Sequence, residues 1–258
     1  MNWKLTLTYD GTGYHGWQVQ PGLVTVQGTL AETIRMVVGE EVLPQASGRT
    51  DAGVHALAQV VSFALEANIP QSNLHRALNR ALPPSIRVVT TEPVEDGFHA
   101  RHATREKTYE YRIFERRRAG VERVCSPFLA PYVWDCRWPL DMDAMQAAAT
   151  AILGRHDFTS FGASDPDMAT REDGDGVNPM KTMLSSAFVQ EGELLVYRVT
   201  GSGFLHHMVR NLVGTFTDIG RGAMAKDCVA EILAAKNRTA AGPTAPASGL
   251  FLHSVRYA

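Results

Sequence analysis

Apolar and polar residues follow two different periods in the first third of the chain. They alternate over residues 3–9, which predicts a half-buried strand. Apolar residues recur at helical spacing over 26–38, so a helix is predicted there. A strand at 59–65 and a helix at about 72–82 should follow, and that helix must stop because two prolines come directly after it.

The rest of the chain mixes the same two periods without a detectable repeat. The strands predicted there cover 108–114, 184–189, 194–200 and 250–257. The predicted helices cover 141–153, 205–219 and about 226–236. Because strands and helices do not alternate as regular βαβ units, we expect an α+β fold around a largely antiparallel mixed sheet flanked by helices.

The length and the linker candidates favour two intimately joined subdomains over separable modules. Acceptable linkers occur only at 97–104 and in the acidic segment 165–179. We therefore expect an N-terminal subdomain at 1–103 and a C-terminal subdomain at 104–258 that includes the returning last strand. The acidic segment is predicted to be a mobile surface loop.

Composition narrows the class of protein. The chain has 258 residues, of which 45% are hydrophobic, enough for a substantial core. It has no apolar run of transmembrane length and no charged-then-apolar leader, so we expect a cytoplasmic protein without a membrane partner. Its three cysteines are never spaced as CxxC, which argues against a disulfide framework and a cysteine-based zinc site.

The formal net charge of −2 does not by itself indicate a nucleic-acid-binding protein. The distribution is uneven, however, since residues 101–118 hold seven basic residues against three acidic ones, and 165–175 hold five acidic residues against one arginine. The basic run is either a solvated strand and turn or part of a surface that binds an anionic partner.

One carboxylate lies in an unusual local sequence. Asp51 stands between Gly48 and Gly53, two residues from Arg49, and just before an apolar strand. The glycines permit left-handed or crowded backbone conformations, and a neighbouring guanidinium favours the ionised carboxylate. An anionic Asp51 could act as a nucleophile, whereas the simpler alternative is a β-turn whose aspartate bonds to its own backbone.

The predicted helix at 205–219 carries a polar face opposite its apolar stripe. At about 100° per residue, this face holds His206, Arg210, Gly214 and Thr217, with His207 beside it. Either it is the ordinary solvent face of an amphipathic helix, or it approaches an anionic site. A mononuclear metal site is disfavoured, because the adjacent histidines point apart and no carboxylate follows at i+4.

Aromatic residues accompany the basic run. The strand predicted at 108–114 places Tyr109 on the same face as Lys107 and Tyr111. Such tyrosines can stack on nucleobases, although core and cross-strand packing is the commoner role.

Taken together, several ordered motifs resemble the bacterial tRNA pseudouridine synthase A family over nearly the whole chain. The motifs are Tyr9-Asp10-Gly11 with Tyr14-His15-Gly16-Trp17-Gln18, Thr25-Val26-Gln27-Gly28, Gly48 to Ala56, Phe98-His99-Ala100-Arg101, Lys107 to Tyr111, Asp157 to Phe161, Gly203 to Asn211, and Ala241 to Leu250. The largest departure is the segment 165–183, which is longer and more acidic than the family pattern.

The resemblance implies the pseudouridine synthase fold, a homodimer, and isomerisation of uridine to pseudouridine at positions 38, 39 and 40 of the tRNA anticodon stem-loop. It also implies that no cofactor is needed. By resemblance Asp51 is the nucleophile, Arg210 is its ion-pair partner, and Tyr109 stacks on the flipped base. Further RNA contacts are expected from Arg49, His55, Arg101 and His206.

Three routes for Asp51 stay open: attack on the ribose C1′, addition to C6 of the base, or deprotonation of the sugar. Two other classes of function also remain. A catalytically idle tRNA-binding protein would keep the basic surfaces. A carboxylate-based nucleoside or glycoside hydrolase would need a second, proton-donating carboxylate near Asp51, and no motif supplies one.

Overall fold

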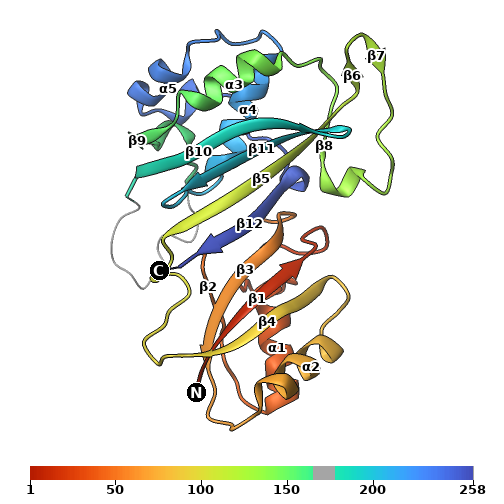
Figure 1. Ribbon diagram of the computed structural model, residues 1–258, viewed down its shortest axis with the longest axis vertical. Helices are drawn as coiled ribbons and strands as arrows, with labels where there is room; N and C mark the ends of the chain where they lie inside the picture. Colours follow the sequence, from red (N-terminus) through yellow and green to blue (C-terminus); the bar gives the residue numbers. More distant parts are fainter. Residues whose placement is uncertain (165–177, 258) are drawn as a thin grey trace. The chain divides into compact units, whose positions relative to one another are not determined.

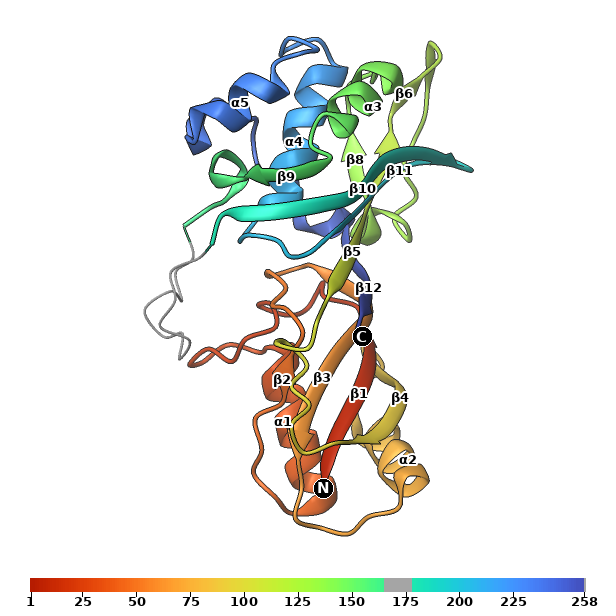
Figure 2. The same ribbon diagram turned by 60° about the vertical axis from the view of Figure 1, so that its left-hand side comes forward.

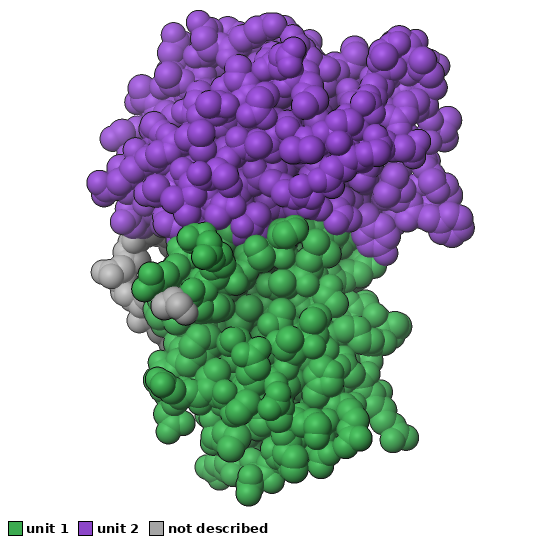
Figure 3. All heavy atoms as spheres, viewed as in Figure 1, with its two compact units in different colours: residues 1–107, 251–258 green, residues 108–250 purple. Residues whose placement is uncertain are grey.

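The computed structural model describes residues 1–164 and 178–257 (Figures 1 and 2). The chain forms two compact units, one of residues 1–107 and 251–258 and one of residues 108–250 (Figure 3). Compared with the division expected at 103/104, the boundary falls four residues later, and residues 251–258 belong to the first unit. Most of the acidic segment expected to be a mobile loop, residues 165–177, lies outside the described residues.

The first unit is built on four neighbouring strands. Their order is β4 (Ile86–Val94), β1 (Asn2–Tyr9), β3 (His55–Ala64) and β12 (Leu250–Arg256), with the short β2 (Gln45–Ala46) also paired to β3. β1 runs antiparallel to both of its neighbours. β12 runs parallel to β3, so the end of the chain completes a sheet begun at its start (Figure 1).

Two helices cover one face of this sheet. They are α1 (Val26–Val38), which Thr25 caps by accepting the Gly28 N–H, and α2 (Gln71–Ala81). The helices pack on each other, and α2 packs on β4 (Figure 2). The alternating apolar residues of β1 are fully buried while the residues between them are half-buried, as expected for a strand with one covered face.

The second unit contains the other long strands. Their order is β5 (Glu106–Glu115), β11 (Leu194–Gly201), β10 (Met180–Glu191) and β9 (Gly154–Asp157), with β8 (Trp134–Cys136) parallel to β5. β10 runs antiparallel to both β9 and β11. A small hairpin of β6 (Arg117–Arg118) and β7 (Val121–Glu122) follows β5.

In its described residues the second unit contains the α-helices α3 (Met142–Thr150), α4 (Met208–Gly220) and α5 (Val229–Ala235). α3 packs on α4 and on β10 (Figure 1). The expected α+β class with a mostly antiparallel sheet is thus confirmed. No helix in the described part of the chain is long and apolar enough to cross a lipid bilayer.

Candidate active site

Asp51 lies in the connection between β2 and β3 in the first unit. The two strands pair antiparallel, so residues 47–54 form the link of a hairpin. The carbonyl of Asp51 accepts the N–H of Val54 at 3.1 Å, which closes a turn, and the residue is half-buried. The carboxylate is therefore carried by a short closed turn between paired strands, and this loop is called the Asp51 loop below.

An earlier loop of the first unit braces the Asp51 loop. Trp17 N–H donates to the Thr50 carbonyl at 2.9 Å, and Gly53 N–H donates to the Tyr14 carbonyl at 3.2 Å. Gly16 has a φ of +85°, and a Cβ there would lie 2.7 Å from the Thr50 carbonyl oxygen. The close approach therefore requires glycine at position 16. The left-handed backbone expected at Gly53 is also present, at a φ of +77°.

His55 contributes to this support. Its side chain is buried, its Nδ1 accepts the Gly11 N–H at 3.0 Å, and its ring stacks on Phe251 at 4.6 Å between centroids. Only 1% of the residue is exposed, so packing of the loop is the role that the structure itself shows for His55. Of the other two cations expected here, Arg49 is half-buried and Arg101 is exposed in the connection between β4 and β5.

In the second unit, Tyr109 lies on β5 and is 8% exposed. Its ring meets the ring of Phe204 edge to face, with centroids 5.0 Å apart and an interplanar angle of 81°. Phe204 belongs to the connection between β11 and α4. It occurs in one of the recognised motifs, but nothing in its spacing indicated that it fixes the orientation of Tyr109.

Arg210 lies in the first turn of α4 and is half-buried. Its Nε donates to the Ala245 carbonyl at 2.8 Å, while Ala245 N–H donates to the Arg210 carbonyl at 3.1 Å. Nearby, the Tyr111 hydroxyl donates to the Pro246 carbonyl at 2.8 Å. Burial raises the pKa of Tyr111 well above its ordinary value and the Arg210 guanidinium opposes this, so Tyr111 stays a neutral donor.

The prediction of a polar face on a helix at 205–219 is wrong in two respects. First, α4 begins at Met208, so His206 precedes the helix. Second, Gly214 and Thr217 are buried, and the segment 241–245 packs directly against Gly214. A Cβ on Gly214 would lie only 1.7 Å from the Pro243 carbonyl oxygen, so glycine at this position serves close packing.

The two histidines form the entry to α4. His207 adopts a left-handed backbone with a φ of +59°, which turns the chain into the helix. The His206 and His207 rings lie 3.9 Å apart between centroids, and His206 Nδ1 lies 2.9 Å from the Ser164 carbonyl. Both residues are half-buried, so His206 keeps the partial exposure that an RNA contact needs.

A hydrogen-bond network that the sequence did not reveal holds the segment 241–245 against α4. Asn211 Nδ2 donates to the Phe161 carbonyl at 2.7 Å, and its Oδ1 accepts from Thr244 at 2.7 Å and from Arg238 at 3.0 Å. Arg238 also donates to the Gly242 carbonyl at 2.9 Å. The network fixes the segment that presents the Ala245 carbonyl to Arg210, and its members come from distant parts of the sequence.

Much of the basic run at 101–118 is neutralised by neighbouring carboxylates. Arg116 makes two hydrogen bonds to Asp135, at 2.8 and 2.6 Å, and Arg117 contacts Glu122 at 2.7 Å. Within the run, the buried Glu110 accepts from Arg112 at 2.8 Å. The hypothesis that this run is a continuous anion-binding surface therefore finds little support within the second unit.

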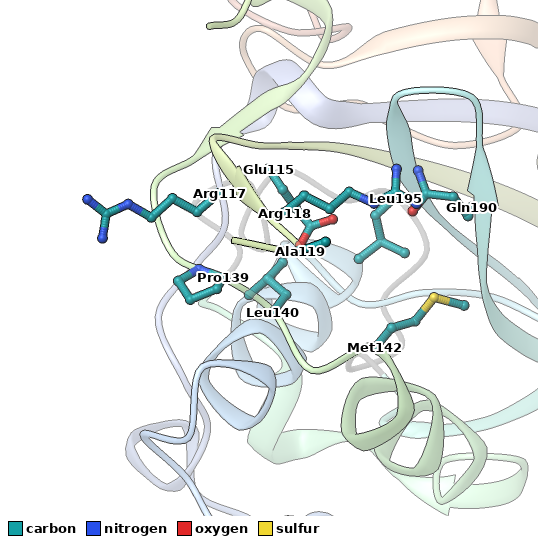
Figure 4. Close-up of a pocket in the computed structure, with 9 residues that line it drawn as sticks. All are labelled: Glu115, Arg117, Arg118, Ala119, Pro139, Leu140, Met142, Gln190 and Leu195. Carbon is teal, nitrogen blue, oxygen red and sulfur yellow. The ribbon is translucent and has the colours of Figure 1, made fainter. Parts of the chain in front are cut away.

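A separate cavity of about 170 Å³ in the second unit contains none of the predicted site residues (Figure 4). Its lining includes Glu115, Arg118 and Leu140. Burial raises the pKa of the Glu115 carboxyl, while Arg118 and the Leu140 backbone oppose the rise. Arg117 points away from the other labelled side chains in Figure 4, so the charged groups of this lining do not converge on one point as catalytic groups would.

Comparison with known proteins bears directly on this arrangement. Residues 6–102 and 148–258 match the family described as tRNA pseudouridine synthase. A protein named tRNA pseudouridine synthase A from Solibacter usitatus is 48% identical over 254 residues, covering 98% of each chain. Proteins of the same name from Moorella thermoacetica and Thermodesulfovibrio yellowstonii are 43% and 37% identical, covering 98% and 100% of each chain.

The match includes the Asp51 loop, Arg210 and the segment that holds Arg210, all of which lie inside the matched ranges. Residues 103–147, which contain Tyr109, lie between them and are covered by the relatives that match nearly the full chain. The chain belongs to the tRNA pseudouridine synthase family, and is a pseudouridine-forming isomerase that acts on tRNA.

Proposed function

We propose that this enzyme converts uridine to pseudouridine at positions 38, 39 and 40 of the tRNA anticodon stem-loop, with Asp51 as its nucleophile. The reaction breaks the bond between N1 and C1′ and joins C5 to C1′ of the same nucleotide. One proton leaves C5 and one is taken up at N1, so no oxidant or reductant is consumed. The observation that carries the proposal is the half-buried carboxylate of Asp51 on a closed turn.

Arg210 is proposed as the ion-pair partner of Asp51 during the reaction. Family membership and the opposite charges of the two groups support this role. The bond from Arg210 Nε to the Ala245 carbonyl fixes the plane of the guanidinium, which leaves the outer edge of the fork oriented for a carboxylate.

Tyr109 is proposed to stack on the flipped uracil. Its edge contact with Phe204 holds the ring in one orientation, and a fixed aromatic face can receive a base at low entropic cost. Arg49, Arg101 and His206 remain proposed RNA contacts. For His55, which is buried against Phe251, the proposed contribution is to support the Asp51 loop from below and so to hold the surface that meets RNA.

Substitution of Asp51 by asparagine tests the proposal. Asp51→Asn keeps the shape of the side chain and removes its charge, so it should bind tRNA and release no tritium from C5-labelled uridine. Asp96→Asn makes the same change on an exposed turn and serves as the control. Substantial turnover by Asp51→Asn would rule out the assigned nucleophile.

Product analysis separates this function from the alternatives. Unmodified tRNA incubated with the enzyme alone should gain pseudouridine, and substrates with a single uridine at position 38, 39 or 40 should each be modified. Release of free uracil would indicate a hydrolase. Activity should also survive exhaustive chelation, since the proposed chemistry needs no metal. The proposed compartment is the cytoplasm, where the tRNA substrate is expected.

The enzyme is further proposed to act as a homodimer. Three apolar side chains of the segment 121–128 are exposed, Val121 by 61%, Val124 by 92% and Phe128 by 89%, and several exposed apolar side chains in one segment are typical of an interaction surface. Pairing of two chains would cover these side chains and enlarge the surface available to an anticodon arm.

Light scattering tests the assembly. Phe128→Glu should shift the enzyme toward monomer, whereas Met36→Glu, at another exposed apolar residue in α1, should not. A monomeric wild-type enzyme that is fully active at the same concentration would refute the dimer.

A further inference from the structure

A buried amide lies beneath the Asp51 loop. Gln59 is on β3 and is 0% exposed. Its Nε2 donates to the Gly48 carbonyl at 2.8 Å, and its Oε1 accepts from the Ser47 hydroxyl at 2.7 Å. Ser47 is also 0% exposed, so its bond to Gln59 is shielded from water, while the bond to the half-buried Gly48 is partly buried. One side chain therefore holds two successive residues at the start of the loop.

A second buried group holds the loop one residue before Asp51. The hydroxyl of Tyr9 bonds to Thr50 Oγ1 at 2.8 Å, and both residues are buried. Burial raises the pKa of Tyr9 to about 12, so the phenol keeps its proton at neutral pH. The remaining N–H of Gln59 points toward the same phenol oxygen, at 3.5 Å.

Lys107 reinforces the first attachment. Its ammonium donates to the Ser47 carbonyl. A Cβ on Gly48 would lie 2.8 Å from Lys107 Nζ, so the lysine packs directly over the loop backbone. Gly48 thus leaves room for the lysine. The side chains of Gln59, Lys107 and Tyr9 together form hydrogen bonds to loop positions 47, 48 and 50.

We propose that Gln59 is a positioning residue for the pseudouridine-forming reaction, acting through Ser47 and Gly48 to hold the Asp51 carboxylate in its reactive placement. The inference rests on the proposed role of Asp51. Gln59 is fully buried, so its amide N–H and its amide oxygen are both costly to leave without partners, and the amide favours the loop arrangement that satisfies both. A displacement of about 1 Å at a reacting group can lower a rate by about 100-fold.

Gln59→Glu separates positioning from simple core filling. The glutamate is nearly the same size and can still accept from Ser47, but its carboxylate cannot donate to the Gly48 carbonyl. The protonated acid can donate, and burial favours the protonated form. At pH 8 we expect kcat to fall by about 10-fold to 100-fold with KM for tRNA little changed. As the pH is lowered to about 6, the kcat of Gln59→Glu relative to the wild-type kcat should rise several-fold.

Two variants complete the test. Gln59→Leu fills the space without either bond, so its loss of kcat should be the same at every pH relative to wild type. Gln45→Glu introduces the same charge at an exposed position on the neighbouring β2 and should follow the wild-type pH profile. Circular dichroism and tRNA binding would show that each variant is folded.

The proposal is overturned if Gln59→Leu keeps the wild-type kcat, or if the Gln59→Glu ratio is flat between pH 6 and pH 8. If Gln59→Glu does not fold, the variant Ser47→Ala tests the positioning role of Gln59 instead. It removes one donor to Gln59 with little change in volume and should lower kcat by about 3-fold to 10-fold at unchanged tRNA affinity. An unchanged kcat in Ser47→Ala would then refute the role. Turnover by Asp51→Asn would instead refute the proposed nucleophile, whatever the Gln59 variants do.

Discussion

At the scale of single residues, Arg210 depends on the shape of its side chain as well as its charge. The guanidinium bonds through Nε to the Ala245 carbonyl, and a lysine has no atom that could keep this bond while presenting a second donor edge. Arg210→Lys should therefore lower kcat/KM by at least about 10-fold, or about 1.4 kcal/mol. Steady-state kinetics would measure it, with the exposed Arg80→Lys in α2 as control. Equal activity of Arg210→Lys and wild type would show that charge alone suffices.

Tyr109 allows stacking and hydroxyl chemistry to be separated. Tyr109→Phe keeps the ring and its edge contact with Phe204, whereas Tyr109→Leu loses both. We expect the phenylalanine variant to bind tRNA like wild type and the leucine variant to bind about 5-fold or more weakly, since base stacking on an aromatic residue contributes about 1–3 kcal/mol. Filter binding would measure the affinities. If both variants bind equally poorly, Tyr109 does not stack; if only turnover is lost in Tyr109→Phe, the hydroxyl takes part in the chemistry.

Local sequence was sufficient to predict the Asp51 loop but not what surrounds it. The two glycines and the following apolar strand are adjacent in the chain, so the sequence alone predicted a loop that ends where a strand begins. His55 lies in the same motif, yet its burial depends on Phe251, which arrives on a parallel strand from the far end of the sequence. Gln59 looked like an ordinary strand residue, because its bonds to Ser47 and Gly48 exist only once β3 folds back beneath the loop.

At the scale of elements, the accuracy of prediction follows the regularity of the hydrophobic period. β1 alternates without interruption and was predicted within a residue of its observed start. β4 was not predicted, because its register against β1 shifts between Thr6 and Leu7 and leaves Val89 and Thr90 exposed in succession. A bulge of this kind breaks the alternation that marks a strand in the sequence.

For Gly214→Ala, packing and helix propensity predict changes of opposite sign in the free energy of unfolding. Propensity alone would make alanine in α4 more stable by about 1 kcal/mol. The new Cβ would however lie 1.7 Å from the Pro243 carbonyl oxygen, so the covering segment must move. Gly214→Ala should lower the free energy of unfolding by about 2 kcal/mol or more. Chemical denaturation would measure it.

The matched control for that change is Gly13→Ala, where an added Cβ meets nothing within 4 Å. It should leave the unfolding free energy within about 0.5 kcal/mol of wild type or raise it slightly. If Gly214→Ala is as stable as this control, the close approach of the 241–245 segment to α4 is not present in solution.

At the scale of the whole molecule, the net charge of −2 must be reconciled with a polyanionic substrate. An arginine that is already paired with a carboxylate displaces few counterions from bound RNA. A count of basic residues therefore overstates the RNA-binding surface. Arg116 makes two hydrogen bonds to Asp135 and is such a residue, while Arg101, which is proposed to contact RNA, lies exposed in the β4–β5 connection. The two arginines should therefore affect salt dependence differently, although each substitution removes one positive charge.

The dependence of tRNA affinity on salt tests this difference. For the wild-type enzyme the logarithm of the association constant should fall steeply and linearly with the logarithm of salt concentration. Arg101→Gln should reduce the slope by about one unit if the residue contacts a phosphate, and should weaken binding to different tRNAs alike. Arg116→Gln should change the slope much less, because Asp135 already compensates the charge it removes. Fluorescence anisotropy at several salt concentrations would give all three slopes. Equal reductions in the two variants would mean that RNA displaces the Arg116–Asp135 pair, and no reduction in either would place the phosphate contacts elsewhere on the enzyme.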